Sequence, residues 1–239
     1  MKYIELTFAE PARNLACDEA LLDLFEAQKP DDGLLRLWQP DDYFVVLGHS
    51  NRWASEVALS PCEADSVPIL RRLSGGGTVL QGRGCLNYTL ILDREKSVLK
   101  NIGATFRYVL NRHRKLIAAL TGLNVVVEGI SDLTMNGRKF SGNAQYRKAR
   151  YALVHGTFLL NFDLAQIERY LRLPIKQPEY RRHRSHSDFV TNLRLDVDQL
   201  CAGLRDEWGA NAFFHYVPVH EIEQLVHERY GRPEWSTKF

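Results

Sequence analysis

Short apolar runs with the spacing of β-strands alternate with longer helical runs along the 239 residues of this chain. The spacing predicts strands over residues 34–38, 43–47, 67–73, 86–92, 125–127 and 151–160. It predicts helices over residues 14–27, 98–120, 163–171, 196–208 and 219–230. Because strands and helices alternate without a repeat or a Ser/Gly linker, we expect residues 1–239 to form one α/β or α+β domain.

Several positions carry local predictions. Pro40-Asp41-Asp42 predicts a turn that joins the strands at 34–38 and 43–47. Asn136-Gly137 between two strand-like runs indicates a tight hairpin turn. Asn14 is a candidate N-cap for the first helix, and the triple valine at 125–127 predicts a buried strand. Residues 86–92 alternate so that Leu86, Tyr88, Leu90 and Leu92 share one face of a strand.

Composition excludes several classes of protein. A net charge of +2 is too small to indicate a nucleic-acid binder, and 45% hydrophobic residues are ordinary for a globular chain. No run approaches the 18 or so apolar residues of a membrane span, and no signal peptide is visible. The cysteines are far apart and form no C-x-x-C pair: Cys17, Cys62, Cys85 and Cys201. We therefore expect free thiols and a cytoplasmic location.

The first candidate site follows the strand at 67–73, where Arg71 and Arg72 precede Ser74-Gly75-Gly76-Gly77. Three consecutive glycines cost backbone entropy, so they indicate a close approach of the backbone to a ligand or an anion-binding nest of N–H groups. The two arginines could add charge-assisted bonds to a carboxylate or phosphate. A plain loop of small residues is the alternative, and no Lys-Ser/Thr follows as in a P-loop.

The second candidate is the hairpin from Asp132 to Ala144. Lys139 falls two residues after Gly137 on a strand, where a lysine can stabilise developing negative charge without reorganising. Ser141-Gly142-Asn143 adds a hydroxyl, an amide and open backbone groups suited to a polar ligand. A solvated lysine on a hairpin is the alternative.

Two further clusters carry weaker signals. His155-Gly156-Thr157 lies inside an apolar strand, where a glycine can mark close backbone approach, although a lone histidine there is more often a hydrogen-bonded core residue. The basic run from Tyr180 to His186 could bind nucleic acid or an acidic protein, and a solvated loop is favoured over nucleic acid. His183 and His186 have H-x-x-H spacing without further ligands, so no metal site is predicted.

Taken in order, Arg-Arg-x-Ser-Gly-Gly-Gly-Thr-Val, Asp-Leu-x-x-Asn-Gly-Arg-Lys-x-Ser-Gly-Asn-Ala and His-Gly-Thr-x-Leu-Leu resemble the lipoate–protein ligase A family. The opening helix with Asp18-Glu19 and the strand before Asn51 fit as well, so the likeness covers roughly residues 10–175. The resemblance implies the α/β fold shared with biotin ligases and octanoyltransferases, a mixed sheet with flanking helices.

The resemblance also implies an activity. Lipoate or octanoate would react with ATP and Mg²⁺ to give an acyl-adenylate, and a lysine of a lipoyl-accepting protein would then take the acyl group. Lys139 would contact the carbonyl and phosphate oxygens. The implied substrate- and nucleotide-binding residues are Arg72, Ser74, Gly75, Gly76, Gly77, Thr78, Val79, Leu80, Cys85, Asn87, Asp132, Ser141, Gly142, Asn143, Ala144, His155, Gly156 and Thr157.

Departures from the family pattern leave alternatives open. Gln81-Gly82-Arg83-Gly84-Cys85 stands where many members read His-Asp-x-Gly-Asn, and we expect the C-terminal accessory domain to be absent or supplied as a separate protein. A transferase that uses a cysteine thioester is the main rival, although the loop 128–132 has no cysteine and only Cys85 could serve. A lipoyl-adenylate-binding module that needs a partner is the other alternative.

Overall fold

The computed structural model describes residues 1–239, apart from the side chain of Ser97. The strands are β1 (Lys2–Glu5), β2 (Leu34–Trp38), β3 (Phe44–Leu47), β4 (Ile69–Arg71), β5 (Val79–Gln81), β6 (Cys85–Asp93), β7 (Val125–Glu128), β8 (Asp132–Met135), β9 (Arg138–Arg147), β10 (Tyr151–Leu159) and β11 (Ala212–Phe213). The helices are α1 (Pro11–Gln28), α2 (Trp53–Glu56), α3 (Leu59–Ala64), α4 (Ile102–Thr121), α5 (Ala165–Tyr170), α6 (His186–Phe189), α7 (Val197–Trp208), α8 (Val219–Leu225) and α9 (Pro233–Ser236). Short turns of helix are η1 (Ser97–Leu99), η2 (Glu179–Arg181) and the π-helical η3 (Val226–Tyr230).

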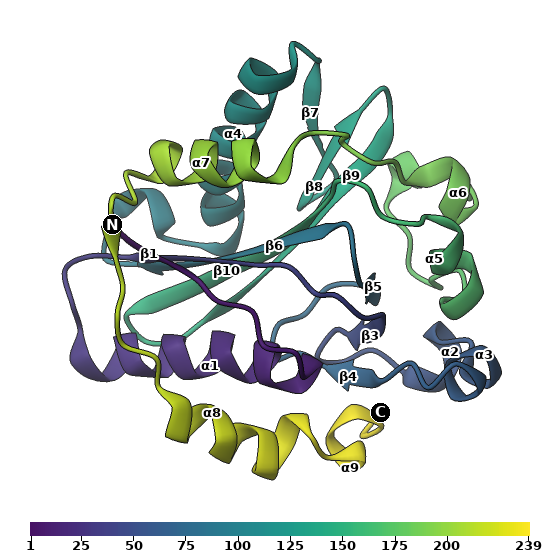
Figure 1. The fold of residues 1–239 in the computed structure, drawn as a ribbon. Helices are drawn as coiled ribbons and strands as arrows, with labels where there is room; N and C mark the ends of the chain where they lie inside the picture. The colour runs from purple at the N-terminus through teal and green to yellow at the C-terminus, as the bar shows by residue number, and fades with distance from the viewer.

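A large mixed sheet forms the centre of the molecule, with the strand order β11-β1-β2-β6-β10-β9-β8-β7. Helices α4 and α7 cover one face, and α1 covers the other, with α8 packed against α1 (Figure 1). A smaller sheet, β4-β3-β5, lies at one end with α2, α3 and α5 around it. The predicted α/β class with a mixed sheet and flanking helices is therefore confirmed.

The alternation of β6 decides which side chains face which helix layer. Leu86, Tyr88, Leu90 and Leu92 lie in the core under α4 and α7, which confirms the predicted face. Ile91 packs instead in the core with α1. Because Asn87 and Thr89 share a face of the strand with Ile91, they also point to the α1 side. The polar residues of the central strands therefore gather on one face.

Three local predictions need correction. Asn14 does not cap α1, because the helix begins at Pro11; its side chain instead bonds both backbone groups of Phe8 and accepts from Arg36. Strand β7 is an edge strand, which leaves Val126 exposed and not buried. The strands over residues 34–38 and 44–47 exist but belong to different sheets, so they form no hairpin.

The Asn136-Gly137 hairpin is confirmed. Asn136 and Gly137 have φ values of 50° and 70°, the positive values that a type I′ turn requires of both central residues. Strands β8 and β9 pair antiparallel on either side of the turn, with Met135 opposite Arg138. The turn therefore fixes the register of the strand that carries Lys139.

Candidate functional site

The α1 side of the large sheet carries a closed set of polar contacts near the start of β6. Gln81 Nε2 donates to Thr157 Oγ1 at 2.7 Å, and Thr157 Oγ1 donates to Asn87 Oδ1 at 2.5 Å. Asn87 Nδ2 returns a bond to Gln81 Oε1 at 3.0 Å. Each of the three side chains thus satisfies the next, so this ring braces β5, β6 and β10 against one another.

The buried Arg72 side chain fixes the glycine-rich loop through hydrogen bonds. Its guanidinium donates to Ser74 Oγ at 3.1 Å, to the Val46 carbonyl at 3.3 Å, and to the carbonyls of Gly75 and Gly77 at 2.6 and 2.9 Å. Burial lowers the pKa of Arg72 to about 10, against the opposing effect of a nearby glutamate. The arginine is therefore committed to shaping the loop.

Two loops meet at the glycines. A Cβ added to Gly48 would lie 2.1 Å from the Gly76 carbonyl oxygen, so only glycine permits this contact. By contrast, a Cβ added to Gly75 or Gly77 meets no atom within 4 Å. The loop is therefore tightly packed at Gly76 and open on either side. Thr78 also bonds to Glu56, which tethers the end of the loop.

A β-bulge sets the direction of Lys139. Strand β8 pairs Leu133 with Ser141 and Thr134 with Lys139, so Phe140 is an extra residue on β9. The Lys139 side chain lies across Gly142, where an added Cβ would come within 2.8 Å of Nζ. Gly142 pairs with Thr157 on β10, so the bulge brings the lysine to the α1 side of the sheet.

Lys139 is held by an ion pair with a buried carboxylate. Its Nζ lies 2.7 Å from Asp132 Oδ1, and the two side chains are 25% and 12% exposed. The hydroxyl of Tyr180 donates to the other oxygen, Asp132 Oδ2, at 2.6 Å. Burial raises the pKa of Tyr180, and the adjacent Asp132 raises it further, so the hydroxyl keeps its proton. The ammonium group is thus positioned but accessible.

Ser141 and Asn143 point to the opposite face of the sheet. Tyr88, in the core under α4 and α7, donates its hydroxyl to Asn143 Oδ1 at 2.6 Å, and Asn143 Nδ2 donates to the Ser131 carbonyl at 2.7 Å. A Cβ added to Gly156 would lie 2.0 Å from Asn143 Oδ1, which explains the glycine in β10. These residues support the hairpin from behind.

A buried polar relay joins the glycine-rich loop to α1. Ser74 Oγ lies 2.6 Å from His155 Nε2, and His155 Nδ1 lies 3.2 Å from Asp18 Oδ2. Arg36, with no exposed side-chain surface, forms an ion pair at 2.6 Å with Asp18 Oδ1. Arg72 donates to Ser74, because a guanidinium can only donate, and His155 Nδ1 donates to the ionised Asp18, which can only accept. Ser74 Oγ and His155 Nε2 join these two ends, and the tautomer of the imidazole decides which of them donates.

The electrostatics of Asp18 fit its role as an acceptor. Burial would raise the pKa of Asp18, but Arg36 and the contacts with His155 outweigh it, so the pKa lies below its ordinary value. An ionised Asp18 both accepts from His155 and balances the buried charge of Arg36. The structure therefore adds Asp18 and Arg36 to the residues that shape the site.

Comparison with known proteins identifies the family. Residues 10–201 match the model of the lipoyl protein ligase A/B catalytic domain. A protein of Aeropyrum pernix assigned as a lipoate-protein ligase A is 30% identical over 235 residues, which cover 97% of this chain and 80% of that protein. The chain belongs to the lipoyl protein ligase A/B family.

The chain is shorter than several members of this family. A Mycoplasma genitalium protein assigned as a lipoate-protein ligase A is 34% identical over 165 residues, which cover 68% of this chain but only 47% of the relative. The matched region thus spans about half the length of that ligase and four fifths of the Aeropyrum protein.

Solved structures share the fold at lower identity. A bipartite lipoate protein ligase of Thermoplasma acidophilum, studied with its E2 lipoyl domain, superposes with a TM-score of 0.82 at 22% identity and covers 99% of this chain and 96% of its own. A lipoate-protein ligase A bound with ATP gives a TM-score of 0.83 at 21% identity, with 99% of each chain covered.

Cys85 does not have the environment of a reactive thiol. It is buried at the start of β6, and burial raises the pKa of its thiol to about 12. A thiolate is the nucleophilic form of cysteine, and it is scarce at neutral pH for such a group. Cys85 is also part of the apolar cluster beside the smaller sheet.

The basic run from Tyr180 to His186 is only partly solvated. Arg181 and His186 are buried and bond to each other, and Arg184 donates to the carbonyls of Gly137 and Tyr180. Arg182 and His183 remain exposed. The bond from Arg184 to Gly137 therefore attaches the loop to the hairpin that carries Lys139.

Among the described residues, no group of three or more His, Cys, Asp or Glu could hold a metal ion.

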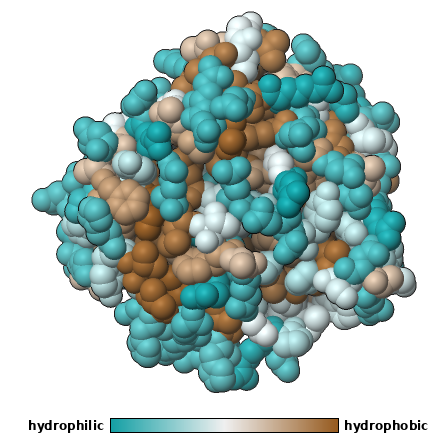
Figure 2. All heavy atoms as spheres, viewed as in Figure 1, coloured by the Kyte–Doolittle hydropathy of each residue, from teal (hydrophilic) through white to brown (hydrophobic). Residues whose placement is uncertain are grey.

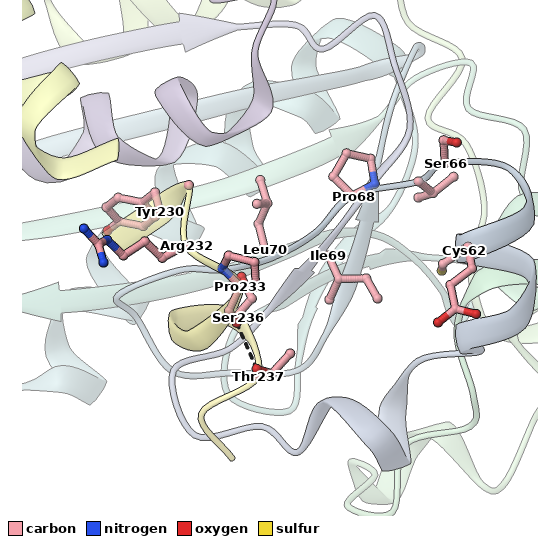
Figure 3. Close-up of a pocket in the computed structure, with 13 residues that line it drawn as sticks. Cys62, Ser66, Pro68, Ile69, Leu70, Tyr230, Arg232, Pro233, Ser236 and Thr237 are labelled. Atoms are coloured by element: carbon pink, nitrogen blue, oxygen red, sulfur yellow. Dashed lines mark hydrogen bonds between the residues drawn. The ribbon is translucent and has the colours of Figure 1, made fainter. Parts of the chain in front are cut away.

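A separate pocket of about 420 Å³ lies between β4 and the C-terminal segment (Figure 3). Ile69, Leu70 and Pro233 contribute to its walls, and none of the motif residues reaches it. Nearby, the Arg71 guanidinium donates to five backbone carbonyls, two of them at Trp235 and Ser236. Arg71 therefore ties the C-terminal segment to the fold, and it is not free for a ligand.

Among the described helices, none is long and apolar enough to cross a membrane.

The sequence pointed to Lys139, His155 and the glycine-rich loop, but it gave no signal for Asp18, Arg36 or Tyr180 as parts of one site. Asp18 and Arg36 meet His155 only through the packing of α1 on the sheet, and Tyr180 reaches Asp132 from a loop 48 residues away.

Proposed function

We propose that this protein is an ATP-dependent lipoate–protein ligase. It converts lipoate or octanoate and ATP to an acyl-adenylate, and then transfers the acyl group to a lysine of a lipoyl-accepting protein. Membership of the ligase family and the names of its relatives support this activity. The fold shared with an ATP-bound ligase agrees with it.

One observation carries the proposal: the bulge that turns Lys139 onto the same face as the glycine-rich loop and His155. In the first step a carboxylate oxygen attacks the α-phosphorus of ATP, and pyrophosphate leaves with the bonding electron pair. Negative charge develops at the α-phosphate, where the ammonium of Lys139 stabilises it. The lysine exchanges its contact with Asp132 for the ligand as the substrates bind.

The glycine-rich loop forms the other wall of the site. The open positions at Gly75 and Gly77 let a ligand approach the backbone, and Thr78, Val79 and Leu80 continue the wall into β5. Arg72 and Ser74 hold the loop in shape through the buried relay. Asn87 and Thr157 brace the strands behind it.

In the second step the neutral amine of the acceptor lysine attacks the carbonyl carbon of the acyl-adenylate. The bond between the carbonyl carbon and the bridging phosphate oxygen breaks, and AMP leaves with the bonding electron pair. The amine proton passes to solvent. Mg²⁺ would enter as the MgATP substrate complex, because Mg²⁺ in such enzymes is held largely by the substrate phosphates and water. A lipoyl domain is the acceptor, and a separate accessory protein assists, as the description of the Thermoplasma ligase as bipartite suggests.

The transferase alternative is disfavoured by the state of Cys85. Its buried thiol with a pKa near 12 is a poor nucleophile, and the other cysteines are buried as well. Free cysteines agree with the proposed cytoplasmic location.

Lipoate-dependent exchange of labelled pyrophosphate into ATP tests the adenylation step. We expect Lys139→Ala to lower this exchange by about 10²–10³-fold, the typical loss when one preorganised charge donor is removed. Arg138→Ala is the matched control, because the neighbouring Arg138 bonds to the Ser187 carbonyl instead of facing the site. Equal exchange in the two folded variants would remove Lys139 from the mechanism, and acyl-carrier-dependent transfer without exchange would favour the transferase.

A further inference from the structure

The two most exposed large hydrophobic side chains among the described residues stand close to the proposed site. Ile130 is 77% exposed and Ile175 is 80% exposed, and Leu173 is exposed as well. Ile130 lies two residues before Asp132, in the loop between β7 and β8. Isolated exposed apolar residues are common, so their position beside Lys139 is what needs explanation.

These side chains come from two loops that touch each other. A Cβ added to Gly129 would lie 3.4 Å from the Tyr180 ring and 3.7 Å from Pro178 Cβ. Tyr180 in turn bonds to Asp132, the partner of Lys139. The loop around Ile130 and the segment from Pro178 to Tyr180 therefore meet beside Asp132, the partner of Lys139. Ile175 stands exposed three residues before Pro178 in that segment.

A basic rim accompanies the apolar residues. The segment 172–184 holds five arginines and lysines and one glutamate, whereas the whole chain has a net charge of only +2. Lys176, Arg182 and His183 are exposed within it. We call Ile130, Leu173, Ile175, Lys176, Arg182 and His183 the mouth patch.

The rim of the mouth patch is rigidly presented. Arg182 and His183 both have positive φ values, of 52° and 57°, which non-glycine residues rarely adopt. Arg184 holds this turn through bonds to the carbonyls of Gly137, Tyr180 and Arg181. A backbone turn that is fixed before binding loses less entropy when a partner docks.

We propose that the mouth patch is the docking surface for the acceptor: a folded protein domain with acidic side chains and a small apolar contact around its target lysine. This inference rests on the proposed function, since it identifies the partner of the second step. The basic rim matches an acidic domain, and the isoleucines match apolar contacts between proteins. Nucleic acid is a poorer fit, because bases stack on aromatic rings and the exposed apolar residues here are aliphatic.

The two half-reactions separate docking from adenylation. The first variant pair is Ile130→Ser/Ile175→Ser, which removes apolar contact, and the second is Lys176→Glu/Arg182→Glu, which reverses the rim charge. Ile102→Ser is the control, because Ile102 is an exposed apolar residue (55%) that lies away from the mouth patch. Its carbonyl accepts from Gln145, which is seven residues along β9 from Arg138 at the hairpin. The probes are pyrophosphate exchange, and transfer from preformed lipoyl-AMP to a recombinant apo-lipoyl domain.

We expect both mouth-patch variants to raise the KM for the apo-lipoyl domain by about tenfold or more. The first loses apolar burial at the interface and the second loses charge pairing, and either loss weakens binding of the domain. Pyrophosphate exchange should stay within about twofold of the original protein, and Ile102→Ser should change neither quantity. Added salt should raise the KM of the original protein more than that of the charge-reversed variant.

Unchanged transfer in both mouth-patch variants would overturn the proposal, as would competition by single-stranded RNA that the charge reversal abolishes. If the original protein shows no lipoate-dependent pyrophosphate exchange even when a candidate accessory protein is added, the proposed function fails. Calorimetric titration with the apo-lipoyl domain then still decides the docking surface. Binding that the Ile130→Ser/Ile175→Ser variant loses supports it, and equal or absent binding in both proteins refutes it.

Discussion

Replacing Asp18 by Asn tests whether the buried relay supports the fold. The substitution keeps the size of the side chain and removes its negative charge. Arg36 is fully buried and would then lack its only carboxylate partner. Removing one partner of a buried ion pair typically costs about 3–5 kcal/mol, because an uncompensated charge remains in the interior.

The structure places the expected cost at the low end of that range. Arg36 would keep its bonds to the carbonyls of Leu6 and Asn14 and to the Asn14 side chain. We therefore expect a loss of about 3 kcal/mol, or a decrease in Tm of about 6–12 °C for a domain of this size. Asp23→Asn on the same helix is the control, because Asp23 is 43% exposed in its pair with Lys148 and such a pair contributes about 0–1 kcal/mol.

Urea unfolding at several pH values provides the measurement. The pKa of Asp18 is lowered from 3.8 in the folded state, so its contribution is complete above that value and is lost as pH falls through the lower folded-state value. The stability difference between the original protein and Asp18→Asn should thus be constant between about pH 5 and 8 and shrink below 3.8. A loss no larger than that of Asp23→Asn would refute the role of the buried pair.

Two further substitutions have defined outcomes. Gly156→Ala should destabilise the protein by about 1–3 kcal/mol in urea unfolding, because its Cβ would overlap Asn143 Oδ1, whereas Gly77→Ala, with open space around it, should change stability far less. Equal losses would mean that the packing behind β10 is not the constraint. Cys85→Ser should retain most ligase activity, and iodoacetamide at pH 8 should leave native Cys85 unlabelled, because its pKa is near 12. An acyl-thioester on Cys85 in the intact mass spectrum would contradict this.

Much of the architecture followed from local sequence signals. The alternation of Leu86, Tyr88, Leu90 and Leu92 placed one face of β6 correctly, and Asn136-Gly137 located the hairpin. These signals work because strand period and turn dihedrals depend on neighbouring residues alone. Sheet membership depends on distant partners, so the sequence could not show that β2 and β3 lie in separate sheets.

The fate of a polar side chain was harder to predict from sequence for the same reason. The sequence indicated ligand binding for Arg71 and Arg72 and helix capping for Asn14. In the structure, each side chain instead forms hydrogen bonds to other parts of the protein. Their acceptors are mostly backbone carbonyls of segments brought near by folding. A charged residue type shows that a partner is needed, but not whether the partner is a ligand or the chain itself.

The hairpin that carries Lys139 shows how much a single irregularity decides. Strict alternation along β9 would put Lys139, Ser141 and Asn143 on one face. The extra residue at Phe140 breaks that alternation, so the lysine faces the glycine-rich loop while Asn143 faces Tyr88 in the core. The bulge also buries Phe140 under α4 and α7, which stabilises the irregularity with apolar contact. The direction of the lysine therefore depends on core packing on the far side of the sheet, and the sequence around Lys139 alone does not contain that information.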